Sequence, residues 1–212
     1  MALRDHPSRA RVCPPLAAAG IVRRRLCLNG PGLASMSNIA NYSATETLRN
    51  GRRLEVRAFR PEDRDNFIAA VGRIGPLTRY RRFFTLKTSF TEREKDFFLN
   101  IDFDKHVALN ALLDEAGRQV VVAAGRYVLV QPKKAEVAFT VIDQYQGQGI
   151  APILLRHLIG IARSAGLQTL IAEVLTENSQ MLKVFERSGL PVQTTKDDPE
   201  VIHVTMHLDR MG

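Results

Sequence analysis

Alternating apolar and polar residues predict several β-strands along this chain. In the segment "RLEVRAF", Leu54, Val56 and Ala58 alternate with charged residues, as in a strand that buries one face. Five further segments have a strand-like pattern and cover residues 106–114, 118–130, 134–143, 167–176 and 200–208. The turn sequences "EAGR" and "QPKK" separate the first three of these segments, and such short joins favour an antiparallel meander.

Apolar residues that recur every three or four positions predict helices between these strands. One helix starts at Pro61 with acids in its first turn, and another starts at Thr91, which opens a capping box. A long apolar helix is predicted after Gly149, and a fourth helix runs from Asn178 as its N-cap to Gly189. This order of strands and helices is typical of an α+β (mixed α/β) domain.

The start of the chain differs in composition from the rest. Residues 1–35 contain six arginines and one aspartate, so they carry +5 of the formal net charge of +8. The weak apolar pattern predicts that residues 1–50 form a disordered or poorly ordered extension and that residues 51–212 form one domain. Cys13 and Cys27 lie in this extension without metal-ligand or catalytic company.

Composition and charge narrow the classes of function. The 212 residues, 45% hydrophobic, suffice for one core, and no apolar run reaches the roughly 18 residues of a membrane span. We therefore expect a cytoplasmic protein without a membrane partner. The positive charge lies mostly in the extension, so we do not expect nucleic acid as a partner. His203 and His207 are too far apart on a strand to bind a metal together, and no metal is expected.

The segment "RYRRFF" at residues 79–84 mixes arginines with aromatic residues, which in isolation suggests nucleic-acid stacking. Phenylalanine side chains prefer protein interiors. We therefore interpret the aromatic residues as packed under the sheet and the arginines as facing solvent or a substrate groove.

Two glycines stand between a predicted strand and the long helix, in "QGQGIAPILL". The glycine spacing and lysine of a phosphate-binding P-loop are absent, and Pro152 replaces the third glycine of a dinucleotide fingerprint. A plain tight turn is one interpretation. The other is an anion site, because Gly147 and Gly149 let the backbone approach a ligand and the N–H groups of a helix start bind phosphate.

Two motifs in this half of the chain resemble those of one enzyme family. The segment from Gln146 to Ala151 is similar to the Q/R-x-x-G-x-G/A acyl-CoA signature of the GNAT superfamily of N-acetyltransferases. In "EVLTENSQMLKVFERSGL", an asparagine after a strand opens a helix that ends in Gly189 and Leu190, as in the next motif of that family. Upstream, "RAFRPEDRDNF" and "KAEVAFTV" are similar to the acetyltransferase domain of bacterial protein lysine acetyltransferases of the Pat type.

This resemblance implies the GNAT fold, a central, mostly antiparallel twisted sheet of six to seven strands with about four helices and a splayed central strand pair. It also implies acetyl-CoA as co-substrate, with backbone N–H groups on the pyrophosphate, strand backbone along the pantetheine, and Asn178 near the pantetheine or the leaving sulfur. The residues expected at the pyrophosphate are Gln146, Gly147, Gln148, Gly149, Ile150 and Ala151, and those expected at the pantetheine are Val141 and Ile142.

Acetyl transfer to an amine also needs a base, because an amine with a pKa of about 10.4 is protonated at neutral pH. The resemblance places Glu136, in "KAEVAFTV", at the position of a glutamate base. The alternative is that Glu136 forms a surface ion pair with Lys133 or Lys134. Many members of the family carry a tyrosine acid in the helix after the asparagine, whereas this chain has Phe185 there.

The sequence therefore predicts an acetyl-CoA-dependent N-acetyltransferase (an acyltransferase) in which the amine attacks directly in a ternary complex. Glu136 and Asn178 are the catalytic candidates, and a protein lysine side chain is the preferred acceptor. Two alternatives stay open. One is a small-molecule amine acetyltransferase, and the other is a non-catalytic acyl-CoA-binding sensor, which the missing tyrosine favours.

Overall fold

The computed structural model describes residues 39–84 and 90–209, and the arginine-rich residues 1–35 lie outside these ranges. The described strands are β1 (Ser43–Thr47), β2 (Arg53–Ala58), β3 (His106–Glu115), β4 (Arg118–Gln131), β5 (Lys134–Val141), β6 (Thr169–Leu175), β7 (Val192–Thr195) and β8 (Val201–His207). The described helices are α2 (Arg64–Gly72), α3 (Pro76–Phe83), α4 (Glu92–Leu99), α5 (Ile150–Ser164) and α6 (Ser179–Glu186), with the short 3-10 helices η1 (Pro61–Asp63) and η2 (Asp143–Tyr145).

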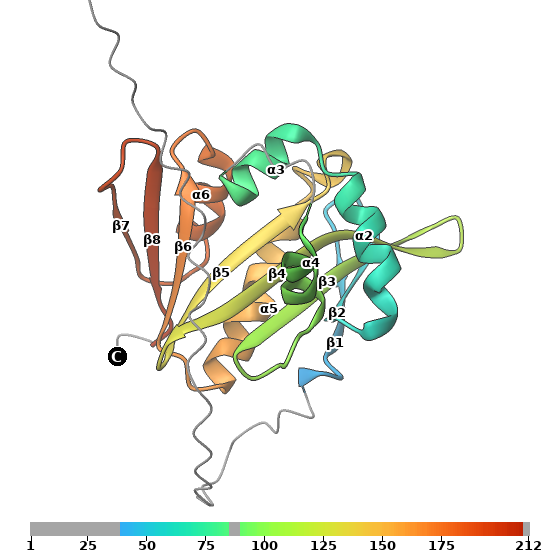
Figure 1. The fold of residues 1–212 in the computed structure, drawn as a ribbon, viewed down its shortest axis with the longest axis horizontal. Coiled ribbons are helices and arrows are strands. Elements are labelled where there is room, and N and C mark those ends of the chain that lie inside the picture. The colour runs from blue at the N-terminus through green and yellow to red at the C-terminus, as the bar shows by residue number, and fades with distance from the viewer. Residues whose placement is uncertain (1–38, 85–89, 210–212) are drawn as a thin grey trace, which may run out of the picture. The chain divides into compact units, whose positions relative to one another are not determined.

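The described strands form one sheet in the order β1-β2-β3-β4-β5-β6-β8-β7 (Figure 1). Neighbouring strands are antiparallel, apart from β5 and β6, which run parallel. The meander predicted from the two short turns is formed by β3, β4 and β5. The α+β class and the mostly antiparallel sheet are therefore confirmed.

The parallel strands β5 and β6 separate soon after they meet. Three residue pairs join them, the last being Glu136 with Ile171, although β5 continues to Val141 and β6 to Leu175. Because the two strands run in the same direction, the gap between them opens toward the loops that precede α5 and α6. The splayed central pair that the resemblance implied is therefore present.

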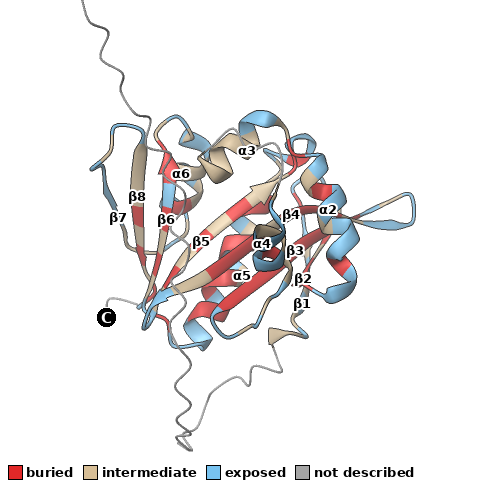
Figure 2. Ribbon diagram, viewed as in Figure 1, coloured by how far each residue is buried: buried red, intermediate tan, exposed pale blue. Residues whose placement is uncertain are grey.

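Helices cover both faces of the sheet. In Figure 1, α5 lies behind the sheet, and its Leu154, Leu158 and Ala162 are fully buried, as the apolar pattern predicts. Helices α2, α3 and α4 lie on the other side, and Figure 2 shows buried positions concentrated in the strands between the two layers. Burying one leucine side chain stabilises a fold by about 1.5–3 kcal/mol, so α5 contributes strongly to the core. None of the helices in the described ranges is both long and apolar enough to cross a membrane.

The sequence analysis missed three elements. β1 and β7 lie at the two edges of the sheet and have the polar sequences SATET and VQTT, so no buried alternation marks them. α3, with the sequence PLTRYRRF, contains no buried residue. The described part of the chain therefore has eight strands rather than six to seven, and five α-helices rather than about four.

The folded part of the chain also starts before residue 51, where we expected the extension to end. β1 pairs with β2 from Ser43 with Arg57 to Thr47 with Arg53. Tyr42 packs against the core just before this strand. The expected boundary is wrong for this stretch, because a polar edge strand has the composition of an extension.

Candidate active site

A glycine turn joins η2 to α5. Gly147 and Gly149 have φ angles of 75° and 85°, in the left-handed region that favours glycine. Helix α5 begins at Ile150, and the first N–H groups of a helix have no partner within it. Within residues 39–84 and 90–209, no backbone acceptor takes a hydrogen bond from the N–H groups of Gly147, Gln148, Gly149, Ile150 or Ala151. These five donors, at the positive end of the α5 dipole, are available for an anion.

Gln146 has a different role from the one we expected. Its N–H donates to the carbonyl of Asp143 at 3.1 Å, so this N–H is not free for a phosphate. Its side-chain amide donates to the hydroxyl of Thr78 at 2.9 Å and to the carbonyl of Val141 at 3.1 Å. Asp143 in turn accepts from the N–H of Gly75 at 3.0 Å and from the hydroxyl of Thr78. The turn before α5 is thereby fastened to the start of α3.

The backbone of β5 presents an unpaired edge to the gap beside β6. Ile142 differs from our expectation, because its N–H donates to the carbonyl of Val122 in β4 at 3.0 Å. Successive N–H groups of a strand point to opposite edges, so those of Val141 and Phe139 face the gap. The pairing with β6 ends at Glu136, so neither of these N–H groups has a strand partner. Val141 stays a candidate for the pantetheine, and Phe139, which the sequence analysis did not name, joins it.

Asn178 is the N-cap of α6, as predicted. Its Oδ1 accepts from the N–H of Met181 at 3.3 Å, and its own N–H donates to the carbonyl of Leu175 at 2.8 Å. These bonds fix Asn178 at the open end of the gap, and its side-chain nitrogen has no partner among the described residues. Phe185, in the same helix, is 2% exposed and packs against Phe139, and its side chain carries no hydroxyl, so it offers no proton here.

Glu136 occupies the point at which β5 and β6 separate, and it is half-buried. Burial raises the pKa of its carboxyl, Glu173 raises it further, and Arg82 of α3 acts in the opposite direction, with a net rise. A carboxylate with a raised pKa is a better proton acceptor near neutral pH. In the described part of the chain Glu136 forms no ion pair, so the alternative pairing with Lys133 or Lys134 is absent there.

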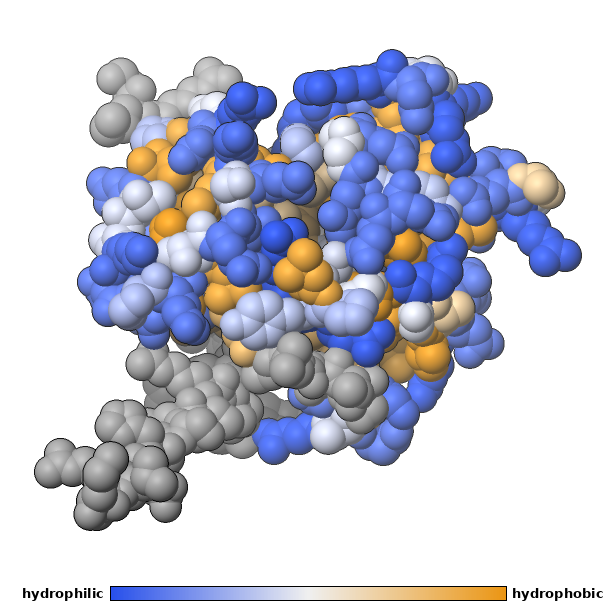
Figure 3. Space-filling view, turned by 90° about the horizontal axis from the view of Figure 1, so that it is seen from above, coloured by the Kyte–Doolittle hydropathy of each residue, from blue (hydrophilic) through white to orange (hydrophobic). Residues whose placement is uncertain are grey.

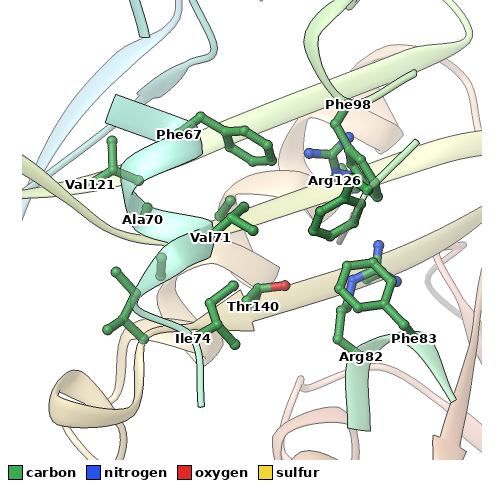
Figure 4. Close-up of a pocket in the computed structure, with 15 residues that line it drawn as sticks. Phe67, Ala70, Val71, Ile74, Arg82, Phe83, Phe98, Val121, Arg126 and Thr140 are labelled. Carbon is green, nitrogen blue, oxygen red and sulfur yellow. The ribbon is translucent and has the colours of Figure 1, made fainter. Parts of the chain in front are cut away.

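A pocket lies on the face of β4 and β5 that points away from α5 (Figure 4). Glu136 is not part of its lining but lies two residues before Ala138, which is, and therefore on the same face of β5. Arg126, Ala138 and Thr140 line it from the two strands, and Arg82 lines it from α3. Its apolar walls include Phe67, Val71, Ile74, Phe83 and Phe98. Seen from above in Figure 3, the surface is hollowed between the β6–β8 side at left and the α2 side at right, with apolar residues inside the hollow.

Two buried basic groups adjoin this pocket, and the sequence analysis named neither. Arg126 and His106 are each 6% exposed, and Nη1 of Arg126 lies 3.1 Å from Nε2 of His106. Burial, reinforced by the charge of Arg126, lowers the pKa of His106 to about 3, so the imidazole is neutral. Burial and the positive charge of Arg82 lower the pKa of Arg126 to about 9. A single arginine within the apolar run "VVVAAGRYVLV" is the one signal that could have identified it.

The arginine-rich segment of α3 follows its interpretation in part, since none of its residues is fully buried. The ring of Phe83 packs against that of Phe98, with centroids 6.0 Å apart. Arg79 donates to the carbonyl of Ile74 at 3.0 Å, while Arg82 lines the pocket. The segment thus supplies both an aromatic wall and a basic group to the site.

Comparison with known proteins agrees with this arrangement. The acetyltransferase (GNAT) domain family matches residues 53–191. The acetyltransferase PA5475 of Pseudomonas aeruginosa is 31% identical over 182 residues, which cover 79% of this chain and 98% of that protein. The acetyltransferase Pat of Mycolicibacterium smegmatis is 30% identical over 174 residues, which cover 73% of this chain and 51% of that protein. This chain therefore spans about half the length of Pat.

Solved structures show the same fold. The GNAT domain of S. lividans PAT is 28% identical and superposes with a TM-score of 0.70, covering 78% of this chain and 96% of that domain. The acetyltransferase yncA of Salmonella typhimurium, solved with acetyl-CoA, is 16% identical and gives a TM-score of 0.59 over 75% of this chain and 96% of that one, a likeness of fold alone. The predicted fold and enzyme class are confirmed, and the chain belongs to the acetyltransferase (GNAT) family, with Pat-type enzymes among its relatives.

Proposed function

We propose that this protein transfers the acetyl group of acetyl-CoA to a primary amine, which attacks the thioester directly in a ternary complex. The observation that carries the proposal is the succession of three features along one gap. Free N–H donors lie before α5, the unpaired edge of β5 follows, and Glu136 lies where β5 and β6 meet. Acetyl-CoA has the matching succession of pyrophosphate, pantetheine amides and thioester.

Each feature supports one part of the chemistry. The N–H groups from Gly147 to Ala151 would bind the pyrophosphate, since such groups at a helix start attract anions. The N–H groups of Val141 and Phe139 would pair with the pantetheine amides and guide the thioester toward Glu136. A backbone N–H on the β5 edge would stabilise the oxyanion that forms on the thioester carbonyl. Asn178 would contact the pantetheine or the leaving sulfur from the β6 side.

The proton of the amine goes to Glu136, directly or through one water. The amine nitrogen then forms a bond to the carbonyl carbon, and the bond from that carbon to sulfur breaks. A thiol with a pKa of about 8.5 is a fair leaving group, so the thiolate departs and takes up, through water, the second proton that the nitrogen loses as the amide forms. This route needs no acid at Phe185, which is buried and carries no hydroxyl.

A protein lysine side chain is the acceptor that the resemblance to protein lysine acetyltransferases implies. This finer assignment is a proposal, because the chain spans about half the length of Pat from Mycolicibacterium smegmatis. A small-molecule amine is the second candidate, favoured by the pocket on this face of β4 and β5. A non-catalytic acyl-CoA sensor is the third candidate, since the tyrosine position holds Phe185.

Incubation with labelled acetyl-CoA separates these candidates. The purified full chain is mixed with labelled acetyl-CoA, a protein lysate and a pool of small amines, and label is then followed in both fractions. Label on lysine residues supports the protein acceptor, and label on small amines supports the second candidate. Calorimetric binding of acetyl-CoA without label on any acceptor would contradict the transferase and support the sensor.

The pyrophosphate site is tested by Gly149→Asp, with Gly117→Asp as the matched control. Both glycines have positive φ, and a Cβ added at either would meet nothing within 4 Å, so both variants carry a similar backbone cost. We expect Gly149→Asp to weaken acetyl-CoA binding by more than about tenfold, because the carboxylate repels the pyrophosphate. Gly117→Asp, in the β3–β4 turn, should bind as the wild type does. Equal calorimetric affinities for two folded variants would remove the basis of this site.

A further inference from the structure

Arg126 has an unusual position for a charged residue. It lies in the middle of β4, is 6% exposed and lines the pocket on this face of β4 and β5. Its guanidinium carbon is 4.5 Å from the ring centroid of Phe98 and 6.0 Å from that of Phe67. Figure 4 shows the guanidinium between these two rings, at the wall of the pocket.

The positive charge of Arg126 is not neutralised by the described residues. Its side chain hydrogen-bonds to His106, a neutral imidazole, and no carboxylate of the described ranges bonds to it. The charged group that acts on it is Arg82, a second cation. Buried charges in proteins are normally paired, because an isolated charge in an apolar interior costs several kcal/mol.

The register of the sheet relates Arg126 to the proposed base. Arg126 pairs with Ala138 of β5, and both line the pocket. Glu136 lies two residues before Ala138 and therefore on the same face of the strand. Side chains in such diagonal positions are roughly 7–8 Å apart at their origins, which is within the reach of one small molecule.

We propose that this pocket is a carboxylate-binding subsite for the acceptor, in which the Arg126 guanidinium binds a carboxylate while the acceptor amine lies at Glu136. The proposal rests on the proposed function for the position of the amine. The aromatic walls favour a carboxylate carried on an apolar body. Guanidinium and carboxylate groups match in geometry, and their charge-assisted bonds are among the stronger ones in proteins. The carboxylate belongs either to a small amino acid or to an acidic residue next to a lysine, and the test distinguishes the two sources.

The first experiment measures binding alone, without acetyl-CoA. Phenylacetate and its neutral amide, phenylacetamide, are titrated into the full chain by calorimetry. We expect the acid to bind more than about tenfold more tightly than the amide, and Arg126→Met to abolish this preference. Arg118→Met, at an exposed position of the same strand, is the control and should keep it. Equal binding of acid and amide by the wild type, or a preference unchanged in Arg126→Met, overturns the proposal.

The second experiment measures transfer and identifies the source of the carboxylate. Two ratios of kcat/KM are measured. The first is the value for phenylalanine divided by the value for phenylalaninamide. The second is the value for a blocked lysine peptide with a neighbouring aspartate divided by the value for the same peptide with asparagine. Comparing each ratio between wild type and Arg126→Met cancels differences in amine basicity. Collapse of the first ratio identifies a small amino acid, and collapse of the second identifies an acidic peptide. If neither ratio changes, the subsite does not serve the acceptor and the proposal is wrong.

Two further variants keep the test decisive if Arg126→Met does not fold. Arg126→Lys keeps the charge but loses the planar fork, so it should retain part of the preference for phenylacetate. Arg126→Gln keeps polarity without charge and should lose the preference. If no acceptor is acetylated, the proposed function fails while the phenylacetate titration still decides whether the subsite exists.

Discussion

Among the described residues, two arginines are buried, and their surroundings differ completely. Arg57, in β2, places its two terminal nitrogens 2.6 Å from the two carboxylate oxygens of Asp63. Asp63 also accepts from the side chain of Asn110 at 3.1 Å and from the N–H of Arg60 at 2.9 Å. The hydrogen bonds to Asp63 outweigh burial and raise the pKa of Arg57.

Arg126, in β4, is equally buried but has a neutral imidazole and two aromatic rings as its neighbours. Burial and the charge of Arg82 lower its pKa to about 9. The charge of Arg57 is thus neutralised inside the fold, whereas that of Arg126 faces a pocket. The comparison teaches that burial alone does not separate a structural charge from a functional one, and that the set of partners does.

The largest loss of activity is expected from a change at Glu136, the carboxylate on the same side of the sheet as Arg126. Glu136→Gln keeps the shape of the side chain but cannot accept a proton, so kcat should fall by about two to four orders of magnitude. The affinity for acetyl-CoA should barely change. Raising the pH should restore part of the activity, because more of the amine is then already deprotonated.

Glu186→Gln, at an exposed position of α6, is the control for Glu136→Gln. It should retain activity within about a factor of three, as expected for an exposed charge. Superimposable pH–rate profiles of wild type and Glu136→Gln would exclude Glu136 as the base.

The same substitution at the two arginines tests the comparison itself. Arg57→Met leaves the Asp63 carboxylate buried without its cation, so the free energy of unfolding should fall by about 3–5 kcal/mol. Arg126→Met removes a buried charge that has no acidic partner, and we expect a change of about 1 kcal/mol or less. Urea unfolding of both variants gives the two values. Similar losses would mean that Arg126 is as structural as Arg57.

A smaller loss of folding stability is expected as the pH falls. Burial alone would raise the pKa of Asp63, but the bonds from Arg57, the N–H of Arg60 and Asn110 outweigh it, so the pKa lies below its usual value of 3.8. The folded state therefore binds this proton less readily than the unfolded state. Its contribution to stability is complete above pH 3.8 and is lost as the pH falls through the lower, folded-state pKa.

Unfolding at pH 5, 3.5 and 2.5 measures this loss, with Asp63→Asn as the variant that cannot titrate. The stability of the wild type should fall more steeply than that of Asp63→Asn. Glu92→Gln, which removes an exposed ion pair with Lys95, should follow the wild-type curve. Parallel curves for wild type and Asp63→Asn would show that Arg57 and Asp63 do not form the pair described.

Sequence reasoning found the features that local pattern determines. The apolar period of α5 and the N-cap at Asn178 depend on neighbours a few residues away. It could not find features that depend on pairing across the sheet. Which N–H of β5 faces β4, and hence the exclusion of Ile142, follows from register alone.

The same reason explains the missed basic pocket. Arg126 and His106 come together because β3 and β4 pair, and the sequence of neither strand alone predicts this contact. The polar strand β1 was missed for another reason: at an edge of the sheet, its pairing with β2 is made by the backbone rather than by apolar side chains. Local periodicity therefore predicts most of the strands and helices, whereas the residues of the site come together only when distant strands pair.

The hydrogen bonds of Asp143 have a thermodynamic consequence. They tie the turn before α5 to the start of α3, and a Cβ on Gly75 would overlap the Asp143 carboxylate, so the contact leaves no room for another side chain. The same helix carries Arg82 and Phe83 to the pocket. A ligand that orders the turn would also order the pocket wall, and by reciprocity an occupied pocket would order the turn to the same extent. Cooperativity between two ligands would then pass through two side chains, those of Asp143 and Gln146.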